Sequence, residues 1–319
     1  MKLSIAIATH NEEENIIRTL ESVYDWVDEI VIVDGDSTDN TIEIIKKFDK
    51  DRKIKGYKES NPAMFHINKQ KAIERCTGEW ILQLDADEVV SPELKKEVLG
   101  VIASDQRERG NLKGIASSQA PRNDDVVAYR IPRLNYFLGK PLRKGGQYPD
   151  YTLRLYKNGV AKFPCKDVHE QVDVRRTEIP RKVEGSPQNQ TQLRERDFSV
   201  ASLTRNDKEI VGYLKAPLLH YPYKTFTDYL TKWIRYCELE ADILYKKNIK
   251  PSWKNFFLYI LVYPDWWFVK TFIRNRGYVD GFPGFIFSVF SALRYRVIYT
   301  MLVERHIRAK GSFIPIKSG

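Results

Sequence analysis

The chain has 319 residues, 42% of them hydrophobic, and a formal net charge of +10. This apolar share excludes a disordered chain and suffices for one large domain or a domain with an appended piece. The basic balance favours an acidic partner, namely phosphates, anionic lipid or nucleic acid. Three widely spaced cysteines (Cys76, Cys165 and Cys237) support neither a disulfide framework nor a zinc site. No secretory signal is visible at the start, so we expect a cytoplasmic chain.

The first hundred residues alternate between strand and helix patterns. Apolar runs predict strands over residues 2–9, 29–34 and 79–88, with a weaker one over 53–59. Helical spacing predicts helices over 11–26, 36–48 and 64–76, the first of them capped by Asn11. This alternation predicts a mostly parallel sheet sandwiched by helices, an α/β fold in which ligands bind beyond the carboxyl ends of the strands.

Polar side chains stand at three of these predicted strand ends. Thr9, Asn11 and Glu12 follow the first strand, and Asp34 and Asp36 follow the second. We expect them to lie near one another at one edge of the sheet. A carboxylate at position 34 is suited to accept a hydrogen bond from a base N–H or a ribose hydroxyl. The alternative is that these acids only shape the turn before the next helix.

The stretch WILQLDADE runs from an apolar strand directly into carboxylates. In an extended segment Asp85 and Asp87 point the same way, so both would face one cation. Mg²⁺ and Mn²⁺ prefer oxygen ligands and often use one or two carboxylates together with substrate phosphates. The alternative is a loop that caps a helix beginning near Ser91. Lys69 lies on the helix predicted over 64–76, where a cation that faces the strand ends would meet a diphosphate. The alternative is a solvated helix lysine, since Lys71 is an equal neighbour on that helix.

Further candidates lie in the middle of the chain. Asp150 flanks a strand predicted within residues 148–159 and is a candidate general base, and Arg154 on that strand is suited to bind phosphate or pair with an acid. His169 and Glu170 form a pair suited to metal or phosphate binding or to acid–base work. Residues 126–139 read as a strand pair or one long bent strand, and residues 104–125 as a loop.

The last third of the chain changes character. Residues 225–247 predict a helix with Thr227 as its cap. We expect two regions, a nucleotide-sugar-binding and catalytic region over 1–222, within which residues 176–208 read as a mobile insertion, and a helical region over 223–319. From Pro251 onward there are 10 Lys or Arg against 3 Asp or Glu, and 17 of the 39 aromatic residues. An apolar run over 256–269, broken by Pro264 and Asp265, is too short to span a bilayer, which predicts interfacial contact with an anionic membrane. A helical subdomain or an oligomer interface is the alternative.

Taken together, these motifs resemble family 2 of the glycosyltransferases, and more closely the bacterial enzymes of lipopolysaccharide-core and related envelope-glycan synthesis. The resemblance rests on IAIATHNEEENI, IVIVDGDSTDNT, GEWILQLDADE, GKPLRKGGQYPDYTLRLY and VHEQV. It implies a nucleotide-diphospho-sugar (GT-A) fold and inverting transfer of a sugar to a hydroxyl of a glycan or glycolipid acceptor. With the basic, aromatic C-terminal region, we expect a peripheral location at the inner face of the cell membrane.

The resemblance also implies roles for individual residues. Thr9, Asn11 and Glu12 match the first nucleotide-contact segment, Asp34 the base- or ribose-binding acid, and Lys69 a position where many members carry arginine. Asp85 and Asp87 match the metal–diphosphate motif that holds Mg²⁺ or Mn²⁺, with His169 near the metal. Asp150 stands where many members have the second acid of a Glu–Asp pair, but Pro149 precedes it here, so Glu170 stays a rival base.

Two other classes of protein fit parts of the pattern. A sugar-phosphate nucleotidyltransferase would share the sheet and the acids, but such enzymes usually carry a Gly-rich loop after the first strand, and ATHNEEEN has no glycine. A nucleic-acid-binding protein would use the basic charge, yet acids crowd the strand ends where such a ligand would bind. We therefore expect no nucleic-acid partner.

Overall fold

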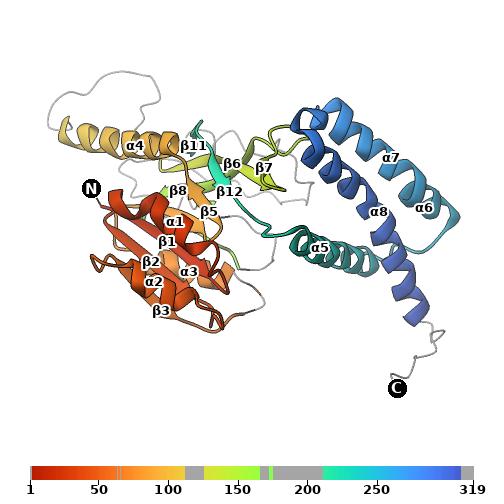
Figure 1. The fold of residues 1–319 in the computed structure, drawn as a ribbon, viewed down its shortest axis with the longest axis horizontal. Helices are drawn as coiled ribbons and strands as arrows, with labels where there is room; N and C mark the ends of the chain where they lie inside the picture. Colours follow the sequence, from red (N-terminus) through yellow and green to blue (C-terminus); the bar gives the residue numbers. More distant parts are fainter. Residues whose placement is uncertain are drawn as a thin grey trace, which may run out of the picture. The chain divides into compact units, whose positions relative to one another are not determined.

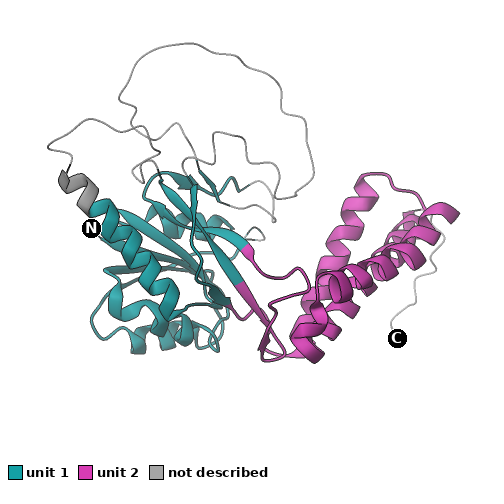
Figure 2. Cartoon of the chain, turned by 90° about the horizontal axis from the view of Figure 1, so that it is seen from above, with its two compact units in different colours: residues 1–133, 151–219 teal, residues 134–150, 220–319 magenta. Residues whose placement is uncertain are grey.

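The computed structural model describes residues 2–62, 64, 66–111, 126–165, 172–174 and 211–309. The chain divides into two compact units, shown in different colours in Figure 2. The first consists of Met1–Arg133 and Tyr151–Leu219, and the second of Leu134–Asp150 and His220–Gly319. The predicted insertion over 176–208 and the pair His169 and Glu170 lie outside the described residues.

The first unit is built on a mixed sheet (Figure 1). Its parallel part has the order β3-β2-β1-β4, formed by β1 (Leu3–Thr9), β2 (Glu29–Asp34), β3 (Ile54–Lys58) and β4 (Trp80–Asp85). Beyond β4 the order continues with β8 (Asp150–Lys157), β6 (Ala128–Phe137), β12 (Leu218–His220) and β5 (Glu88–Val90). Since β8 runs antiparallel to β4, the predicted parallel sheet holds for the first four strands and changes direction at β8.

Short strands complete the sheets. β11 (Val211–Tyr213) pairs in parallel with β6, and β7 (Lys140–Pro141) pairs antiparallel with the end of β6. β9 (Ala161–Lys162) and β10 (Asp173–Val174) form a separate antiparallel pair. Residues 126–139, which the sequence left as one strand or two, hold the single strand β6 and the beginning of its turn.

Helices cover both faces of the parallel part because its strands are apolar on both sides. Leu3, Ile5 and Ile7 of β1 pack with α1 (Ile16–Val23), α2 (Thr41–Phe48) and α4 (Pro92–Asn111). The alternate residue Ala6 points the other way and packs with α3 (His66–Glu74). The sandwich of helices predicted from the alternating pattern is therefore confirmed.

Two local predictions for the first unit were wrong. The first helix begins at Ile16 with Asn15 as its N-cap, because Asn11 adopts a left-handed conformation (φ 56°) and its side chain accepts from the backbone of the next loop. A short 3₁₀ turn, η1 (Tyr24–Trp26), follows that helix. The loop predicted to begin at Ser104 begins later, since α4 continues to Asn111; residues 112–125 lie outside the described part.

The second unit is helical in its C-terminal part. α5 (Phe226–Lys246) begins after Thr225, whose hydroxyl accepts from the backbone N–H of Asp228, so the cap is Thr225 and not Thr227. α5 packs against α8 (Gly281–Ala309) through two apolar clusters that include Tyr229, Cys237 and Ala241. The short helix η6 (Gly277–Asp280) leads into α8.

A continuous helical segment precedes η6 and passes through Pro264. It consists of α6 (Trp253–Phe257), η4 (Leu258–Val262), α7 (Tyr263–Phe268) and η5 (Val269–Arg274), of which η4 and η5 are π-helical. Proline has no N–H to donate to the carbonyl of Ile260. Arg296 of α8 donates its Nε–H to that carbonyl instead, at 2.9 Å. The helix therefore continues where the sequence predicted an interruption, and 253–274 and 277–309 are both long and apolar enough to cross a membrane.

Candidate active site

Strand register brings the predicted polar residues to one edge of the sheet. Thr9 pairs with Asp34 on one side of β1, and Ala8 pairs with Asp85 on the other. With strands about 4.8 Å apart, the backbones of Asp34 and Asp85 lie roughly 10 Å from each other. The convergence that the sequence predicted at the carboxyl ends of β1, β2 and β4 is confirmed.

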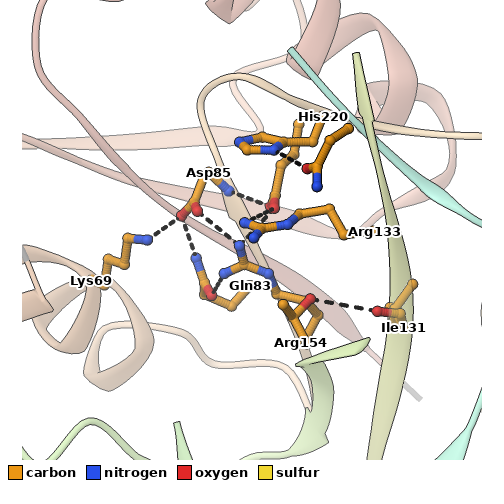
Figure 3. A network of polar contacts seen from close by, with 10 residues as sticks. Lys69, Gln83, Asp85, Ile131, Arg133, Arg154 and His220 are labelled. Carbon is orange, nitrogen blue, oxygen red and sulfur yellow. Dashed lines mark hydrogen bonds and ion pairs between the residues drawn. The ribbon is translucent and has the colours of Figure 1, made fainter. Parts of the chain in front are cut away.

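Asp85 is the centre of a polar network at this edge (Figure 3). Its carboxylate forms ion pairs with Lys69 and with Arg154, the second at 2.7 Å. Gln83, two residues earlier on the same side of β4, donates its amide to the same carboxylate at 3.1 Å. The strand end thus presents one carboxylate held between two cations.

Glu88 extends the network inward from Asp85. Its side chain is 0% exposed, and Arg154 Nη2 donates to its Oε1 at 2.6 Å. The backbone N–H of Asp85 donates to the other oxygen of Glu88 at 2.9 Å. Arg133 lies farther away, with Nη1 3.8 Å from Glu88 Oε1. Glu88 therefore fixes both the guanidinium that pairs with Asp85 and the backbone of Asp85.

The charges around Asp85 control its protonation. Burial by itself would raise the pKa of this carboxyl, but the cations of Arg154 and Lys69 outweigh burial and hold the pKa well below its ordinary value. Burial likewise opposes the charge on Arg154, yet Asp85 and Glu88 raise the pKa of its guanidinium. Asp85 is consequently an anion over the whole physiological pH range and cannot act as a general acid.

Asp87 lies in a turn and not in an extended segment. β4 ends at Asp85 and β5 begins at Glu88, so Ala86 and Asp87 form the connection. The argument that Asp85 and Asp87 point the same way along one strand was therefore wrong. Asp87 is partly exposed in this turn, whereas the carboxylate of Asp85 is held by Lys69, Gln83 and Arg154.

Lys69 and Lys71 are distinguished by their partners. Lys69 is 11% exposed and reaches Asp85, whereas Lys71 pairs with Glu59 at 2.8 Å, away from the strand end. The sequence could not choose between the two. The choice follows from helix geometry, because residues two apart on a helix face in different directions.

Arg154 stands on β8. The sequence left open whether Arg154 binds phosphate or pairs with an acid, and in the structure it pairs with acids. Its guanidinium contacts Gln83, Asp85 and Glu88. Its buried Nε has no hydrogen-bond partner within the described part of the chain. Arg154 therefore orients the acids.

The loops after β1 and β2 hold each other. Asn11 Oδ1 accepts from the backbone N–H of Thr38 at 2.8 Å, and the backbone N–H of Glu12 donates to Thr41 Oγ1 at 2.8 Å. Asp34 is 2% exposed, and its carboxylate accepts both the backbone N–H and the hydroxyl of Ser37. Asp34 thus shapes the turn, as the alternative reading held.

Asp36 is the exposed acid of this edge. It adopts a left-handed conformation (φ 60°) and pairs with Lys58 of β3 at 2.7 Å. The hydrogen bond and charge of Lys58 lower the pKa of its carboxyl.

Among the buried polar atoms that lack a hydrogen-bond partner in the described residues, Thr9 Oγ1 and Asn68 Oδ1 lie near these loops. Thr9 ends β1 between Asp34 and Asp85, and Asn68 precedes Lys69 on α3. The side chain of Asn68 crowds Gly35, where a Cβ would lie 3.3 Å from its Nδ2. Buried polar atoms are normally hydrogen-bonded, so these two fit a polar ligand. Sequence reasoning missed Asn68.

The remaining candidates are less constrained. Asp150 is the first residue of β8 and is assigned to the second unit. His169 and Glu170 lie outside the described residues. Within the described ranges no three His, Cys, Asp or Glu gather into a metal site. The donors Asp85 and Asp87 fit a hard cation that takes its other ligands from phosphates and water, as Mg²⁺ commonly does.

The fold and this edge together define the class of protein. A mixed α/β sheet flanked by helices, with acids and a lysine at the ends of β1, β2 and β4, is the GT-A architecture that the resemblance implied. Residues 4–153 match the sequence profile of glycosyl transferase family 2. This segment, just under half of the chain, carries the family's profile, and together with the relatives below it supports the chain as a family 2 glycosyltransferase.

Curated relatives cover nearly the whole chain. An uncharacterized glycosyltransferase of Rickettsia typhi is 26% identical over 316 residues, covering 97% of this chain and 89% of the relative. LpsC of Rhizobium meliloti, a lipopolysaccharide core biosynthesis glycosyltransferase, is 23% identical and covers 96% and 93%.

Solved structures show a looser likeness. Staphylococcus aureus TarS 1–349 with UDP-GlcNAc is 14% identical with a TM-score of 0.42, covering 99% of this chain and 93% of its own. The mannosyltransferase PcManGT of Pyrobaculum calidifontis, with GDP-Man and Mn²⁺, is 14% identical with a TM-score of 0.42, covering 98% and 86%.

Proposed function

We propose that the chain transfers a sugar from a nucleotide-diphospho-sugar to a hydroxyl of a lipid-linked or envelope glycan acceptor, at the cytoplasmic face of the cell membrane. The assignment of the donor rests on the ion pair between Asp85 and Lys69 at the carboxyl end of β4. The assignment of the acceptor is supported by the similarity to LpsC over almost the full length of both chains.

Lys69 is the residue that we assign to the donor's diphosphate. Its ammonium is held at the strand end by Asp85, which needs no second cation because Arg154 already pairs with it. A diphosphate arriving at this edge therefore finds a desolvated ammonium that can turn to it. Arg154 keeps its ion pairs with Asp85 and Glu88 and continues to neutralise their negative charge.

Asp87 is the carboxylate that we assign to a divalent cation, with Asp85 beside it. Mg²⁺ or Mn²⁺ supplies charge neutralisation on the departing diphosphate, worth several kcal/mol. Asp87 is suited to this role because it is partly exposed in the turn, while Asp85 is anchored and permanently ionised. The protein's part is to hold these two carboxylates in a fixed relation through the turn at Ala86.

The nucleoside would occupy the loops after β1 and β2. The oxygens of Thr9 and Asn68 that lack a partner in the described part of the chain are suited to its base or ribose, and Asn11, Glu12 and Asp34 fix the loops that surround it. Asp36 stands at the rim with Lys58. Asp34 acts in this scheme through the turn it holds, and the exposed Asp36 is better placed to meet a ribose hydroxyl.

The acceptor hydroxyl must lose a proton as it attacks the sugar from the face opposite the diphosphate. One attack at an oxocarbenium-like centre inverts the configuration without a covalent intermediate. We propose that either Asp150 or Glu170 is the base that takes this proton. His169 is a candidate ligand of the cation. Asp85 is excluded from this role by its low pKa.

The proposal is tested by calorimetry of the full chain against UDP-, GDP- and ADP-sugars, with and without Mn²⁺. We expect one nucleotide class to bind with an affinity that Mn²⁺ increases at least tenfold, followed by slow hydrolysis of that donor. If no nucleotide sugar binds in either condition, the donor assignment is wrong. Binding that is indifferent to the cation removes the metal role and leaves the donor role standing.

A further inference from the structure

Exposed apolar side chains gather where the second unit turns from η5 into α8. Ile273, Tyr278, Val279 and Phe282 are 54%, 52%, 58% and 67% exposed, and we call these four residues the apolar tip. Such a concentration of large apolar side chains within ten residues marks an interaction surface and not a random scatter.

Cations flank the apolar tip. Arg274 and Arg276 are exposed and lie between Ile273 and Tyr278 in the chain. The carboxylate of Asp280 accepts the backbone N–H groups of Arg143 and Lys144, at 3.1 and 2.8 Å, which brings two further exposed cations to this turn. Four cations and one hydrogen-bonded acid give the turn a net charge of about +3.

The exposed apolar surface continues along the helical segment before the tip. Trp253, Phe257, Leu261 and Val269 are all exposed and recur at multiples of four residues, ending at Ile273, with Asp265 at the one intermediate position that is not apolar. This spacing suits a helix of alternating α and π turns and places them along one side. Within the same segment the ammonium of Lys270 lies 4.2 Å from the ring centre of Trp267 and 5.0 Å from that of Trp266.

We infer that the apolar tip and the exposed side of the 253–274 segment dock onto an anionic lipid bilayer, with the helix lying in the plane of the interface. Aromatic and aliphatic side chains interleaved with Lys and Arg are the composition of interfacial helices. Charge complementarity selects the bilayer over a second copy of the chain, since two copies meeting here would bring the four cations of each tip together.

An in-plane helix fits the charges better than a crossing helix. Asp265, at the middle of the segment, has a side chain that is 77% exposed and lies 3.5 Å from Arg296. At the bilayer centre such an acid is costly, whereas at headgroup level it stays solvated. The neighbouring helix α8 also pairs with charged residues of α5, as in Arg305 with Asp242 at 2.5 Å, so its second half is not a lipid-facing span.

This docking surface goes beyond the proposed reaction and is tested without any donor. Full-length protein is floated with vesicles of phosphatidylcholine alone or of an equal mixture with phosphatidylglycerol. We expect flotation with the mixed vesicles only. Val279→Ser with Phe282→Ser should weaken it about tenfold or more. Arg274→Gln with Arg276→Gln should weaken it about 25-fold, since each charge contributes about fivefold.

Tyr236→Ser is the matched control, because Tyr236 is 55% exposed on α5 outside the tip. It should float like the parent, and all variants should keep the parent's melting temperature. Equal flotation of the tip variants, or no preference for phosphatidylglycerol, overturns the inference. A tip variant that instead splits an oligomer in sedimentation, with flotation unchanged, assigns the surface to a second copy and overturns it too. Nucleotide-sugar binding, measured without vesicles, should be the same in every variant.

Discussion

The guanidinium of Arg154 lies 2.7 Å from the carboxylate of Asp85 and links it to Glu88, which is buried completely. The charged side chains of Asp85 on β4, Glu88 on β5 and Arg154 on β8 thereby form one network at the strand ends. Arg154 therefore belongs to the scaffold of the site, and Lys69 is left as the cation that can change partners.

Arg154→Met should destabilise the protein by about 3–5 kcal/mol, because it leaves the buried carboxylate of Glu88 with only the more distant guanidinium of Arg133. The free energy of unfolding from urea titration measures this. The double variant Arg154→Met with Glu88→Met should recover most of the loss, since a buried pair replaced by apolar side chains is often near neutral.

Arg75→Met provides the control for that series. Arg75 pairs with Glu59 near the surface, where its side chain is 31% exposed, so its loss should cost no more than about 1 kcal/mol. If Arg154→Met were as mild as Arg75→Met, the buried network would not hold the strand ends as we describe.

Lys69→Met should weaken nucleotide-sugar binding about 10- to 100-fold, the value of one charge-assisted hydrogen bond to phosphate. Lys71→Met removes an equal charge from the same helix but from a residue paired with Glu59, and should leave binding within about twofold. Calorimetry with the donor identified by screening makes the comparison. Equal losses in the two variants would show that only the overall charge of the helix matters.

Much of this fold could be predicted from pattern alone. The strands β1, β2 and β4 are mostly apolar runs that end in polar residues, so a parallel sheet brings Thr9, Asp34 and Asp85 to one edge. The position of β8 could not be predicted, because its antiparallel pairing with β4 joins residues about 75 positions apart in the chain.

The site was less predictable than the sheet, for local reasons. The two-residue turn at Ala86 and Asp87 looks extended in the sequence because both flanks are strand-like. Glu88 was visible as one of three carboxylates, but its complete burial depends on Arg154 arriving from β8. Asn11 resembles a helix cap in composition, and its left-handed backbone turns its side chain to Thr38 instead.

Glu29 makes the stability of the first unit depend on pH. Burial would raise the pKa of its carboxyl, but hydrogen bonds from Lys55, Ser4 and Thr77 lower it from 4.5 to about 2. A carboxyl depressed on folding stabilises the protein above its ordinary pKa, and that stabilisation is lost as the pH falls through the folded value. We expect about 3 kcal/mol of unfolding free energy to be lost between pH 4.5 and about pH 2.

Urea titrations of Glu29→Gln across this pH range check the assignment. The variant should be less stable than the parent at neutral pH, and the difference should shrink as the pH approaches 2. The exposed Glu43→Gln on α2 serves as control and should follow the parent throughout. A difference between Glu29→Gln and the parent that is constant with pH would mean that the loss is one of packing and not of charge.

Asp87→Ala tests whether Asp87 binds the cation, separately from any contribution of Asp87 to stability. Asp87 is partly exposed in the turn between β4 and β5, so its removal should change the melting temperature little. If it holds the cation, the variant should bind the donor equally with and without Mn²⁺ and should transfer sugar at least about 10³-fold more slowly, which corresponds to a few kcal/mol of lost stabilisation of the diphosphate. Asp87→Glu, which keeps the charge on a longer arm, should restore part of the Mn²⁺ dependence. Parent-like activity of Asp87→Ala at saturating Mn²⁺ would assign the cation to other ligands and leave Asp87 a residue of the turn.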